Sequence, residues 1–429
     1  MLSIAQELLS EIDRHRAHYV TFLQDFIRAA SPNPPGDTTA AAKVIKDFLL
    51  SENVKPDIVE PLAHAPNIVA DFDGGQGPGP RVVLNGHIDT FPVEKPEEWD
   101  KGPFSGHNDG ESIHGRGGVD MKAGTAALVI AFTLLMKRAS MMTGSVALTA
   151  VSDEETGGKW GTRYLLEHSG TPSRWAGDVV LNGEPGGLQS IRFGEKGTLR
   201  MTFVVKTPGA NGAYKHVSRG ANIIASKLII KLLEIEHLRP ELPDELRRYL
   251  GSEDVRKVAD DIMGSGAADI LLQPTVNIGT MHGGVKVNVI PEQCVFEADI
   301  RLPIGMAARV VLDRIDEILK DVPEASYEVQ TAASNPANYC TYDHLLAKSI
   351  TKWAEQVTGQ RPVQLAGLGG TDCKFYRYAG IPAYVYGPSP QGMGAQGEKV
   401  SIDEFISLIK VHTLAVWDYL GTSQEDQAA

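Results

Sequence analysis

Apolar residues recur along this chain at two different periods, one helical and one typical of strands. From Leu8 and Ile12 to Phe22 and Phe26 they fall at helical spacing, which predicts one or two amphipathic helices over residues 2–29. The turn-forming segment Ser-Pro-Asn-Pro-Pro-Gly-Asp that follows ends them. The same reasoning predicts further helices over residues 40–50, 122–138, 160–168, 343–357 and 401–420.

Short apolar runs bounded by turn residues alternate with these helices. They predict strands over residues 67–72, 81–84, 146–151, 179–181 and 383–386. Strands that alternate with helices are typical of α/β proteins with a mostly parallel sheet and helices on both faces. The carboxyl ends of such strands meet at one edge of the sheet, where ligand sites are usually found.

The pattern changes near residue 196 and changes back near residue 334. Strand candidates with one polar face lie between these points, at residues 199–206, 275–279, 294–301 and 327–330. Helical stretches are predicted there over residues 222–233, 238–268 and 306–319. We therefore expect a smaller α+β domain with an antiparallel sheet, inserted into the α/β domain. The expected boundaries are 1–195 and 334–429 for the large domain and 196–333 for the insertion.

Composition and charge narrow the class of protein. The chain has 429 residues, of which 42% are hydrophobic and 22% charged, so we expect a globular protein. Its 54 acidic and 41 basic side chains leave a net charge of −13, which disfavours nucleic acid and anionic membranes as partners. The three cysteines form no Cys-x-x-Cys pair, so we expect no disulfide framework and a cytoplasmic protein.

The first candidate for chemistry is a Gly-His-x-Asp motif just after the strand predicted at 81–84. This motif places His87 and Asp89 at the edge of the sheet. A neutral imidazole is a good ligand for divalent metals, and a nearby carboxylate can hold its tautomer. A histidine after a strand is more often a structural residue, so this motif needs support from others.

Three more motifs deliver carboxylates from successive strand or helix ends. Asp120 stands in a glycine-rich turn before an apolar helix, where aspartate is also a common helix cap. Glu154 and Glu155 follow one apolar strand directly, and Glu184 follows the next. Adjacent carboxylates repel one another unless a cation or a shared proton relieves them. One can ligate a metal while its neighbour acts as a general base, so four such motifs in order predict a metal site.

Together these motifs resemble those of the M20 family of metallopeptidases and amidohydrolases, over nearly the whole chain. The family includes carboxypeptidase G2, succinyl-diaminopimelate desuccinylase, acetylornithine deacetylase and aminoacylases. The resemblance implies a catalytic domain with two divalent ions, usually zinc, and an inserted lid domain through which members often form homodimers. By motif match, Asp120 would bridge the two ions, His87 and Glu184 would ligate one, and Glu155 the other.

The resemblance also implies residues for catalysis and substrate binding. Glu154 would be the general base that activates the attacking water, with Asp89 orienting the imidazole. Asn288 and Arg301 lie in segments similar to those that hold a substrate carboxylate, a task that suits the fixed fork of donors on arginine. Without the resemblance, these two segments fit a turn and an ion pair at a strand end equally well. Thr371, in a Gly-Gly-Thr-Asp segment, would lie on the substrate side.

Two segments depart from the family pattern. Where the family has a histidine that ligates the second ion, this chain has Gln396. An amide oxygen is a poor ligand for zinc and suits a harder ion such as Mn²⁺ better. Where the lid normally offers a histidine, this chain has Asn211, whose amide can still donate to a developing oxyanion. The expected cofactor is a divalent metal, Zn²⁺ or Mn²⁺, with one or two ions per chain.

Three functions remain open on this evidence. The leading one is metal-dependent hydrolysis of a C–N bond in a small carboxylate-bearing substrate, of the amide or N-acyl amino acid type. The second is hydrolytic deamination of an aromatic amine at a one-metal site, as in the M20 relative 5-nitroanthranilate aminohydrolase. The third is a catalytically silent binding protein, and the presence of Glu154 beside three ligands of the first ion argues against it.

Overall fold

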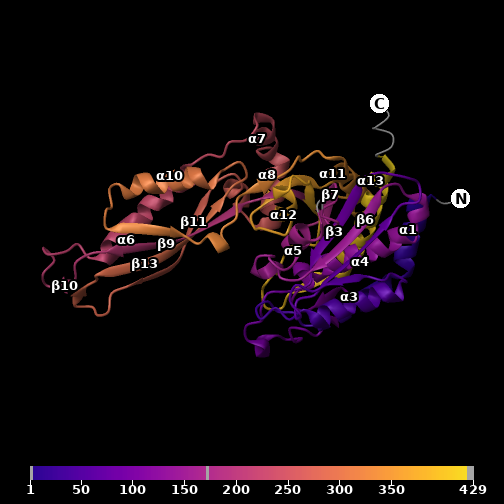
Figure 1. The fold of residues 1–429 in the computed structure, drawn as a ribbon, viewed down its shortest axis with the longest axis horizontal. Helices are drawn as coiled ribbons and strands as arrows, with labels where there is room; N and C mark the ends of the chain where they lie inside the picture. The colour runs from indigo at the N-terminus through magenta and orange to yellow at the C-terminus, as the bar shows by residue number, and fades with distance from the viewer. Residues whose placement is uncertain (1–2, 171–172, 423–429) are drawn as a thin grey trace.

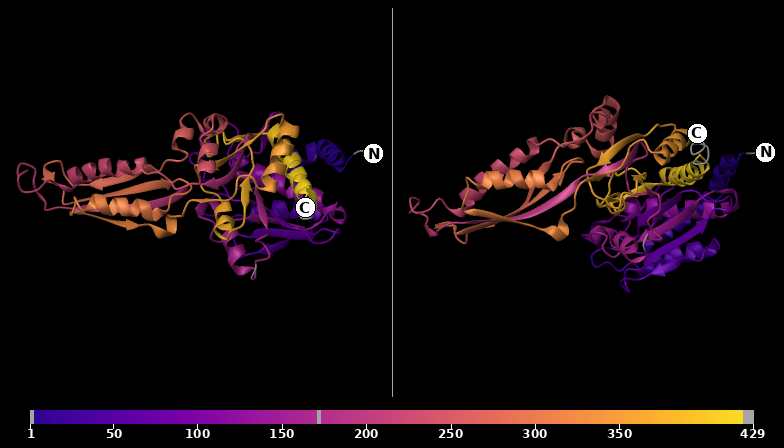
Figure 2. Two further views of the ribbon diagram at one scale, coloured as in Figure 1. Left: turned by 90° about the horizontal axis from the view of Figure 1, so that it is seen from above. Right: turned by 45° about the horizontal axis from the view of Figure 1, so that its top comes forward.

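A computed structural model describes residues 3–170 and 173–422 of the chain. Figure 1 and Figure 2 show an elongated molecule in which a small domain projects from one end of a large one. The large domain contains a nine-stranded sheet, and the small domain contains a four-stranded sheet. This is the predicted combination of an α/β domain with an inserted α+β domain.

The N-terminal segment forms two helices rather than one. Helices α1 (Ile4–Arg14) and α2 (Arg16–Arg28) are followed by α3 (Thr39–Ser51). Ser3 begins α1 with a capping box, in which its side chain accepts from the backbone N–H of Gln6. Each helix buries one apolar stripe against the large domain, as the sequence periodicity predicts.

The central sheet is parallel in its middle and antiparallel towards its edges. Its strand order is β1-β2-β6-β3-β7-β17-β8-β15, with β16 pairing β8 in parallel. The bounds are β1 (Asp57–Val59), β2 (Asn67–Asp73), β3 (Arg81–His87), β6 (Ser145–Val151), β7 (Val179–Asn182), β8 (Ser190–Glu195), β15 (Asn338–Tyr339), β16 (Val363–Gly367) and β17 (Ala383–Val385). Strands β6, β3, β7 and β17 run parallel to one another, so their carboxyl ends meet at one edge.

Helices cover both faces of this sheet. Along β3, Val82 and Leu84 face one core together with α4 (Ala123–Met136), α11 (Leu345–Thr358) and α13 (Ile402–Thr422). Val83 faces the other core with α5 (Thr162–His168) and α12 (Cys373–Tyr378). The helical stretch Gly118–Met136 is long and apolar enough to cross a membrane, but 94% of its most apolar window is buried inside the protein. It therefore serves as the central core helix.

The small domain has a hydrophobic core of its own. Its sheet has the antiparallel order β11-β13-β9-β14, with helices α6 and α10 packed on one face. The bounds are β9 (Gly197–Lys206), α6 (Ala221–Leu232), β11 (Thr275–Gly283), β13 (Gln293–Leu302), α10 (Ala308–Leu319) and β14 (Ala325–Val329). A two-stranded ribbon of β10 (Ala210–Asn211) and β12 (Val289–Ile290) forms its far tip (Figure 1).

One part of the predicted insertion packs elsewhere. Helices α7 (Asp244–Leu250), α8 (Glu253–Met263) and α9 (Ala267–Ile270) replace the single charged stretch predicted at 238–268. Their apolar residues join the core of the large domain, not that of the small one. The domain boundaries stay a prediction, but these three helices contact the large domain although they lie inside the range 196–333.

Several short elements escape prediction. They are β8, β16 and α12, together with a small sheet of β4 (His107–Asn108), β5 (Ser112–His114) and β18 (Lys399–Ser401). Short helical turns lie at η1 (Pro96–Glu98), η3 (Ala139–Met141), η5 (Leu233–His237) and η6 (Thr331–Ala333). Strand β8 lies inside the sheet, but it contains the charged residues Arg192 and Glu195 among apolar ones. These charges interrupt the apolar run from which a buried strand is predicted. All three cysteines are free.

Two glycines let α4 begin directly against the end of β7. A Cβ on Gly124 would overlap the carbonyl oxygen of Gly183, and a Cβ on Gly183 would lie 2.8 Å from the Gly124 carbonyl carbon. Both neighbours are backbone atoms, which cannot rotate away. This close approach sets the distance between the turn that carries Asp120 and the loop that carries Glu184.

We therefore expect Gly124→Ala to destabilise the protein, although alanine favours helix. The loss from overpacking should be about 1–3 kcal/mol of unfolding free energy, against a gain of about 1 kcal/mol or less from helix propensity. Urea denaturation measures it. Gly421→Ala in α13 is the matched control, because no heavy atom lies within 4 Å of its added Cβ. Equal stability of the two variants would contradict the close-approach argument.

Candidate metal centre

The candidate ligands lie together at the carboxyl edge of the parallel strands. His87 is the last residue of β3, and Glu184 lies two residues beyond β7. Glu154 and Glu155 lie in the short turn η4 (Glu154–Thr156) after β6. Asp120 lies in the turn η2 (Gly118–Lys122), where its backbone leaves helical geometry just before α4. The structure thus brings all four sequence motifs to one place.

The imidazole of His87 is held in one orientation. Its Nδ1 lies 2.9 Å from the backbone carbonyl oxygen of Asp89 and 3.5 Å from the Asp89 carboxylate. A carbonyl oxygen only accepts hydrogen bonds, so Nδ1 must carry the proton and donate it. Nε2 then faces Asp120 Oδ1 at 3.1 Å and Glu184 Oε1 at 3.4 Å, and it offers a lone pair to a metal once its own proton is lost. This is the tautomer that a metal-ligating histidine needs.

Asp89 connects the histidine to the turn that carries the two glutamates. Its buried carboxylate accepts from the backbone N–H groups of Glu154 at 3.2 Å and Glu155 at 3.1 Å. It also accepts from the side chain of Asn33 at 2.8 Å, a contact that sequence reasoning missed. Burial alone would raise the pKa of Asp89, but His87 and these donors hold it below its usual value. Asp89 therefore positions η4 as well as the imidazole.

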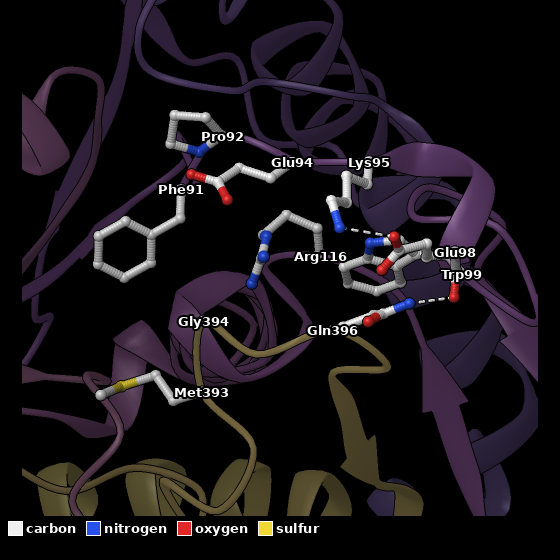
Figure 3. Close-up of a pocket in the computed structure, with 10 residues that line it drawn as sticks. All are labelled: Phe91, Pro92, Glu94, Lys95, Glu98, Trp99, Arg116, Met393, Gly394 and Gln396. Atoms are coloured by element: carbon white, nitrogen blue, oxygen red, sulfur yellow. Dashed lines mark hydrogen bonds and ion pairs between the residues drawn. The ribbon is translucent and has the colours of Figure 1, made fainter.

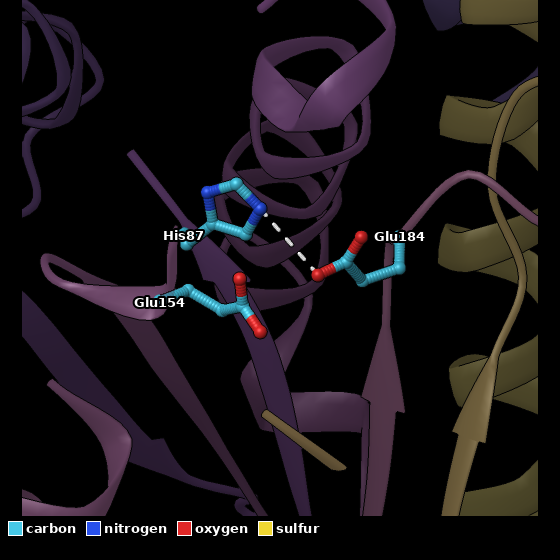
Figure 4. A group of neighbouring side chains, drawn as sticks. All are labelled: His87, Glu154 and Glu184. Carbon is cyan, nitrogen blue, oxygen red and sulfur yellow. Dashed lines mark ion pairs between the residues drawn. The ribbon is translucent and has the colours of Figure 1, made fainter. Parts of the chain in front are cut away.

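Two overlapping groups of side chains have the geometry of a metal site. The ligand atoms of His87, Glu154 and Glu184 lie within 4.8 Å of one another, and so do those of His87, Asp120 and Glu155. Figure 4 shows the first group converging from three separate elements. Glu155 also has a buried carboxylate oxygen with no hydrogen-bond partner among the described residues. These nitrogen and oxygen donors fit a divalent ion such as Zn²⁺ or Mn²⁺.

Crowding of buried carboxylates shifts the acid–base properties of the centre. Burial, and then the charge of Asp120, raises the pKa of Glu155 to about 10 and that of Glu184 to about 7. Burial also raises the pKa of Glu154 well above its usual value. Burial alone would lower the pKa of His87, but Glu184 and Asp120 hold it well above its usual value. In the protein alone these groups therefore retain protons, and a bound cation would replace those protons.

A second layer of charged residues, which sequence reasoning missed, surrounds Glu154. Lys374 Nζ lies 3.6 Å from Glu154 Oε1 and donates to the carbonyl oxygen of Thr371 at 3.1 Å. Asp372 accepts from the hydroxyl of Thr162 at 2.8 Å, and burial raises its pKa to about 6. The Gly-Gly-Thr-Asp motif drew attention to Thr371 only, although the lysine follows it closely.

Glu398 holds the turn that carries Asp120. Its carboxylate accepts from Arg116 at 2.6 Å and from the backbone N–H groups of Val119 at 2.9 Å and Asp120 at 3.3 Å. The glutamate at the end of the Gly-Ala-Gln-Gly-Glu segment was a signal for this role. Sequence analysis considered only Gln396 there.

The structure does not bring Gln396 to this centre. Its exposed side chain donates to the backbone carbonyl oxygen of Glu98, in an adjacent cavity of about 650 Å³ that Figure 3 shows. Residues 394–397 form a turn, and the Gln396 amide lies in this cavity beside Glu98, Trp99 and Arg116. The side chain is thus bonded to Glu98, and ligation of a second ion by Gln396 stays a prediction.

Three of the four predicted substrate-binding residues also lie outside the centre. Asn211 belongs to the ribbon at the far tip of the small domain, and Asn288 directly precedes its other strand. Arg301 pairs with Asp299 at 3.0 Å and donates to Thr198 at 3.3 Å, which is the strand-end ion pair left open as an alternative. Within one chain, the length of the small domain separates Asn211 and Asn288 from the metal centre, whereas Arg301 lies opposite Thr198 near the large domain but does not line the pocket at the centre.

Thr371 does line the pocket at the centre. This pocket has a volume of about 400 Å³ and contains carboxylates on one side and apolar side chains on the other. It is lined by Phe91, Asp120, Glu154, Glu155, Glu184, Pro185, Arg192, Ile262, Met263, Leu368, Gly369, Gly370, Thr371, Pro390 and Met393. The Thr371 hydroxyl donates to Glu195 at 2.8 Å, so the protein already uses its proton.

Comparison with known proteins decides the family. The model of peptidase family M20/M25/M40 matches residues 83–418, which include every candidate ligand described above. The chain belongs to this family. It is therefore a metal-dependent hydrolase of the M20 type, and the resemblance found in its motifs is confirmed.

Individual relatives agree with this assignment. The chain is 26% identical over 390 residues to a succinyl-diaminopimelate desuccinylase from Hydrogenovibrio crunogenus, covering 90% of this chain and 93% of that protein. It has the fold of an M20 family metallo-carboxypeptidase from Sulfolobus solfataricus, with a TM-score of 0.75, 19% identity and coverage of 94% and 99%. A dinuclear metal-binding M20 peptidase from Bacillus subtilis matches with a TM-score of 0.68, 16% identity and coverage of 96% and 99%.

The shifted pKa values predict how metal stabilises the protein at different pH. The pKa of the Glu184 carboxyl group is raised from 4.5 to about 7 in the folded protein. Its protonated form therefore stabilises the metal-free protein below pH 4.5, and this stabilisation is lost as the pH rises through 7. Metal binding requires the ionised form. The rise in melting temperature caused by saturating Mn²⁺ or Zn²⁺ should therefore be larger at pH 8 than at pH 5.5.

Differential scanning fluorimetry after chelation measures this rise. Asp120→Asn should reduce both the rise and its dependence on pH, because it removes one carboxylate from the ligand group. An equal metal-induced rise at both pH values in the unmodified protein would contradict the electrostatic argument.

Proposed function

We propose that this protein hydrolyses the C–N bond of an amide in a small carboxylate-bearing substrate, of the peptide or N-acyl amino acid type. The observation that carries the proposal is the position of Glu154, a largely buried carboxylate that lines the same pocket as Glu184 and lies within 4.8 Å of the ligand atoms of His87 and Glu184. The names of the relatives, a desuccinylase and a carboxypeptidase, support a substrate of this kind.

The protein's own groups provide the proton transfers. A bound divalent cation would supply Lewis acidity that polarises the amide carbonyl and makes water easier to deprotonate. Glu154 accepts the proton of the attacking water and then returns it to the leaving nitrogen. Burial raises the pKa of Glu154, which suits a base that must also act as an acid near neutral pH. The ammonium of Lys374 keeps this carboxylate in place from the other side.

Replacement of the base tests this proposal directly. We expect Glu154→Gln to lower kcat on N-acyl amino acids or dipeptides by at least about 10²-fold, because the amide cannot accept the proton. Metal content, measured by inductively coupled plasma mass spectrometry, should stay close to that of the unmodified protein.

Glu155→Gln provides the matched control in the same turn. It removes a ligand candidate and should lower metal content as well as the rate. A Glu154→Gln protein with a near-normal rate would refute the assignment of the base. Turnover of aromatic amines without turnover of any amide would favour hydrolytic deamination instead.

We also propose that the protein is a homodimer that associates through the small domain. Helix α6 exposes Ile223 and Ile230, two turns apart on one face, with 50% and 67% of their surface accessible. Strand β11 beside it lies at the edge of the four-stranded sheet, with one of its sides unpaired in that sheet. Exposed apolar residues next to an open strand edge are typical of an interface.

Ile230→Glu should therefore convert a dimer into a monomer, because it places a charge in the proposed interface. Light scattering coupled to size exclusion should give twice the chain mass of 46.3 kDa before the substitution and the single mass after it. Ile58→Glu, which makes the same change at an exposed site on the large domain, should leave the dimer intact. A monomer before substitution would contradict the proposal.

A further inference from the structure

The pocket at the metal centre contains one cationic side chain among the described residues that line it. This side chain is Arg192 on β8, which lines the same pocket as the carboxylates of Asp120 and Glu184. Its Nε is buried and has no hydrogen-bond partner. Within residues 3–170 and 173–422, no carboxylate lies within 4.0 Å of its guanidinium as an ion pair. A buried arginine without a partner is costly, and this cost points to a missing ligand.

Two other arginines, Arg377 and Arg301, do not share this property. Arg377 donates to Glu195 at 3.2 Å and to backbone carbonyl groups, and Arg301 is paired with Asp299. The donors of both side chains are therefore already used within the protein. Among the described residues that line the pocket, Arg192 is the one with a guanidinium, a planar fork that can bind a carboxylate through two parallel hydrogen bonds.

Gly367 makes room for the Arg192 side chain, and Gly186 lies within ordinary van der Waals contact of it. A Cβ on Gly367 would lie 3.3 Å from Arg192 Cδ, and a Cβ on Gly186 would lie 3.6 Å from its Nε. Gly186 lies two residues beyond Glu184, so the guanidinium is placed directly beside the metal centre. A substrate carboxylate bound to Arg192 would thus lie next to the amide bond that Glu154 acts on.

The charges of the pocket require such a group. Four carboxylates meet there, at Asp120, Glu154, Glu155 and Glu184, and they would repel an anionic substrate. A bound divalent cation would offset part of the negative charge of the carboxylates that ligate it. The guanidinium of Arg192 in the same pocket provides an attractive position for a second negative group.

The remaining wall of the pocket is apolar and comes from α8. Ile262 and Met263 end this helix and face the pocket together with Leu368 and Met393. Ile262 packs over Gly187, where an added Cβ would lie 3.2 Å from its Cδ1. Helix α8 therefore closes the pocket against the loop that carries Glu184. This wall suits an apolar side chain of a substrate and not a sugar or a second charge.

We propose that Arg192 binds the free carboxylate of the substrate and that the end of α8 receives an apolar side chain next to it. This inference rests on the proposed amide hydrolysis and specifies its substrate class: peptides or N-acyl amino acids whose apolar residue bears a free carboxylate. Arg192 is a specificity-determining residue in this assignment, and Arg301 is not.

A comparison of acids with their carboxamides tests the inference. The metal-loaded enzyme is assayed on N-acetyl-leucine, N-succinyl-leucine and leucyl-leucine, each as the free acid and as the carboxamide. Arg192→Met should lower kcat/KM on the best acid by about 10²–10³-fold, mainly through KM, and change the carboxamide rate by less than about threefold. Arg192→Lys should restore part of the acid rate, because it keeps the charge but loses the fork.

Arg309→Met, an exposed arginine on α10, is the control for loss of one positive charge and should change neither rate. An equal loss of kcat/KM on the acid and on the carboxamide in Arg192→Met would overturn the inference. So would a loss of the preference for the acid in Arg301→Met instead. Neither result would contradict amide hydrolysis itself. Absence of hydrolysis of every compound by the unmodified enzyme would overturn the proposed function itself.

A binding measurement gives a readout that needs no turnover. Calorimetry of N-acetyl-leucine with the metal-loaded Glu154→Gln protein should give a Kd at least about tenfold lower than with the Glu154→Gln, Arg192→Met double variant. Equal binding by the two proteins, strong or weak, would contradict a carboxylate site at Arg192.

Discussion

The mutual repulsion of four buried carboxylates is the constraint on which this site depends. Asp120, Glu154, Glu155 and Glu184 meet around a single imidazole, and burial with crowding raises the pKa values of the three glutamates. Such a cluster is stable only if protons or a cation offset its charge. The protein therefore exchanges protons for metal at this place, and its stability, its metal affinity and the basicity of Glu154 are parts of one equilibrium.

The rest of the large domain holds these groups against their repulsion. Parallel strands bring His87, η4 and the Glu184 loop to one edge, and buried acceptors fix the turns between them. Asp89 binds the backbone of η4, while Glu398 binds the backbone of η2 and is itself neutralised by Arg116. Each uses a carboxylate as an acceptor for backbone N–H groups, so the ligands are oriented before any ion binds.

The metal centre and the proposed dimer interface lie in different domains. The metal centre belongs to the large domain, whereas the tip of the small domain carries Asn211 far from it (Figure 1). Helices α7 to α9 are the exception, because they return from the insertion to the large core and supply a wall of the pocket. On our proposals, α8 and Arg192 select the substrate, and the exposed face of α6 serves assembly.

Local sequence determined the α/β alternation and the ligand motifs, because apolar periodicity and the residues at strand ends report on the backbone nearby. His87, Asp120, Glu155 and Glu184 could be read in this way, and so could Glu154. Only the tertiary structure decided the partners of these residues. Asn33, Lys374 and Glu398 lie far along the chain from the groups they contact, and no local pattern records such pairs. The same holds for Gln396, whose side chain donates to the backbone of Glu98. It also holds for Arg192: its charge made the strand β8 hard to predict, and only the folded pocket shows that its Nε is buried without a hydrogen-bond partner among the described residues.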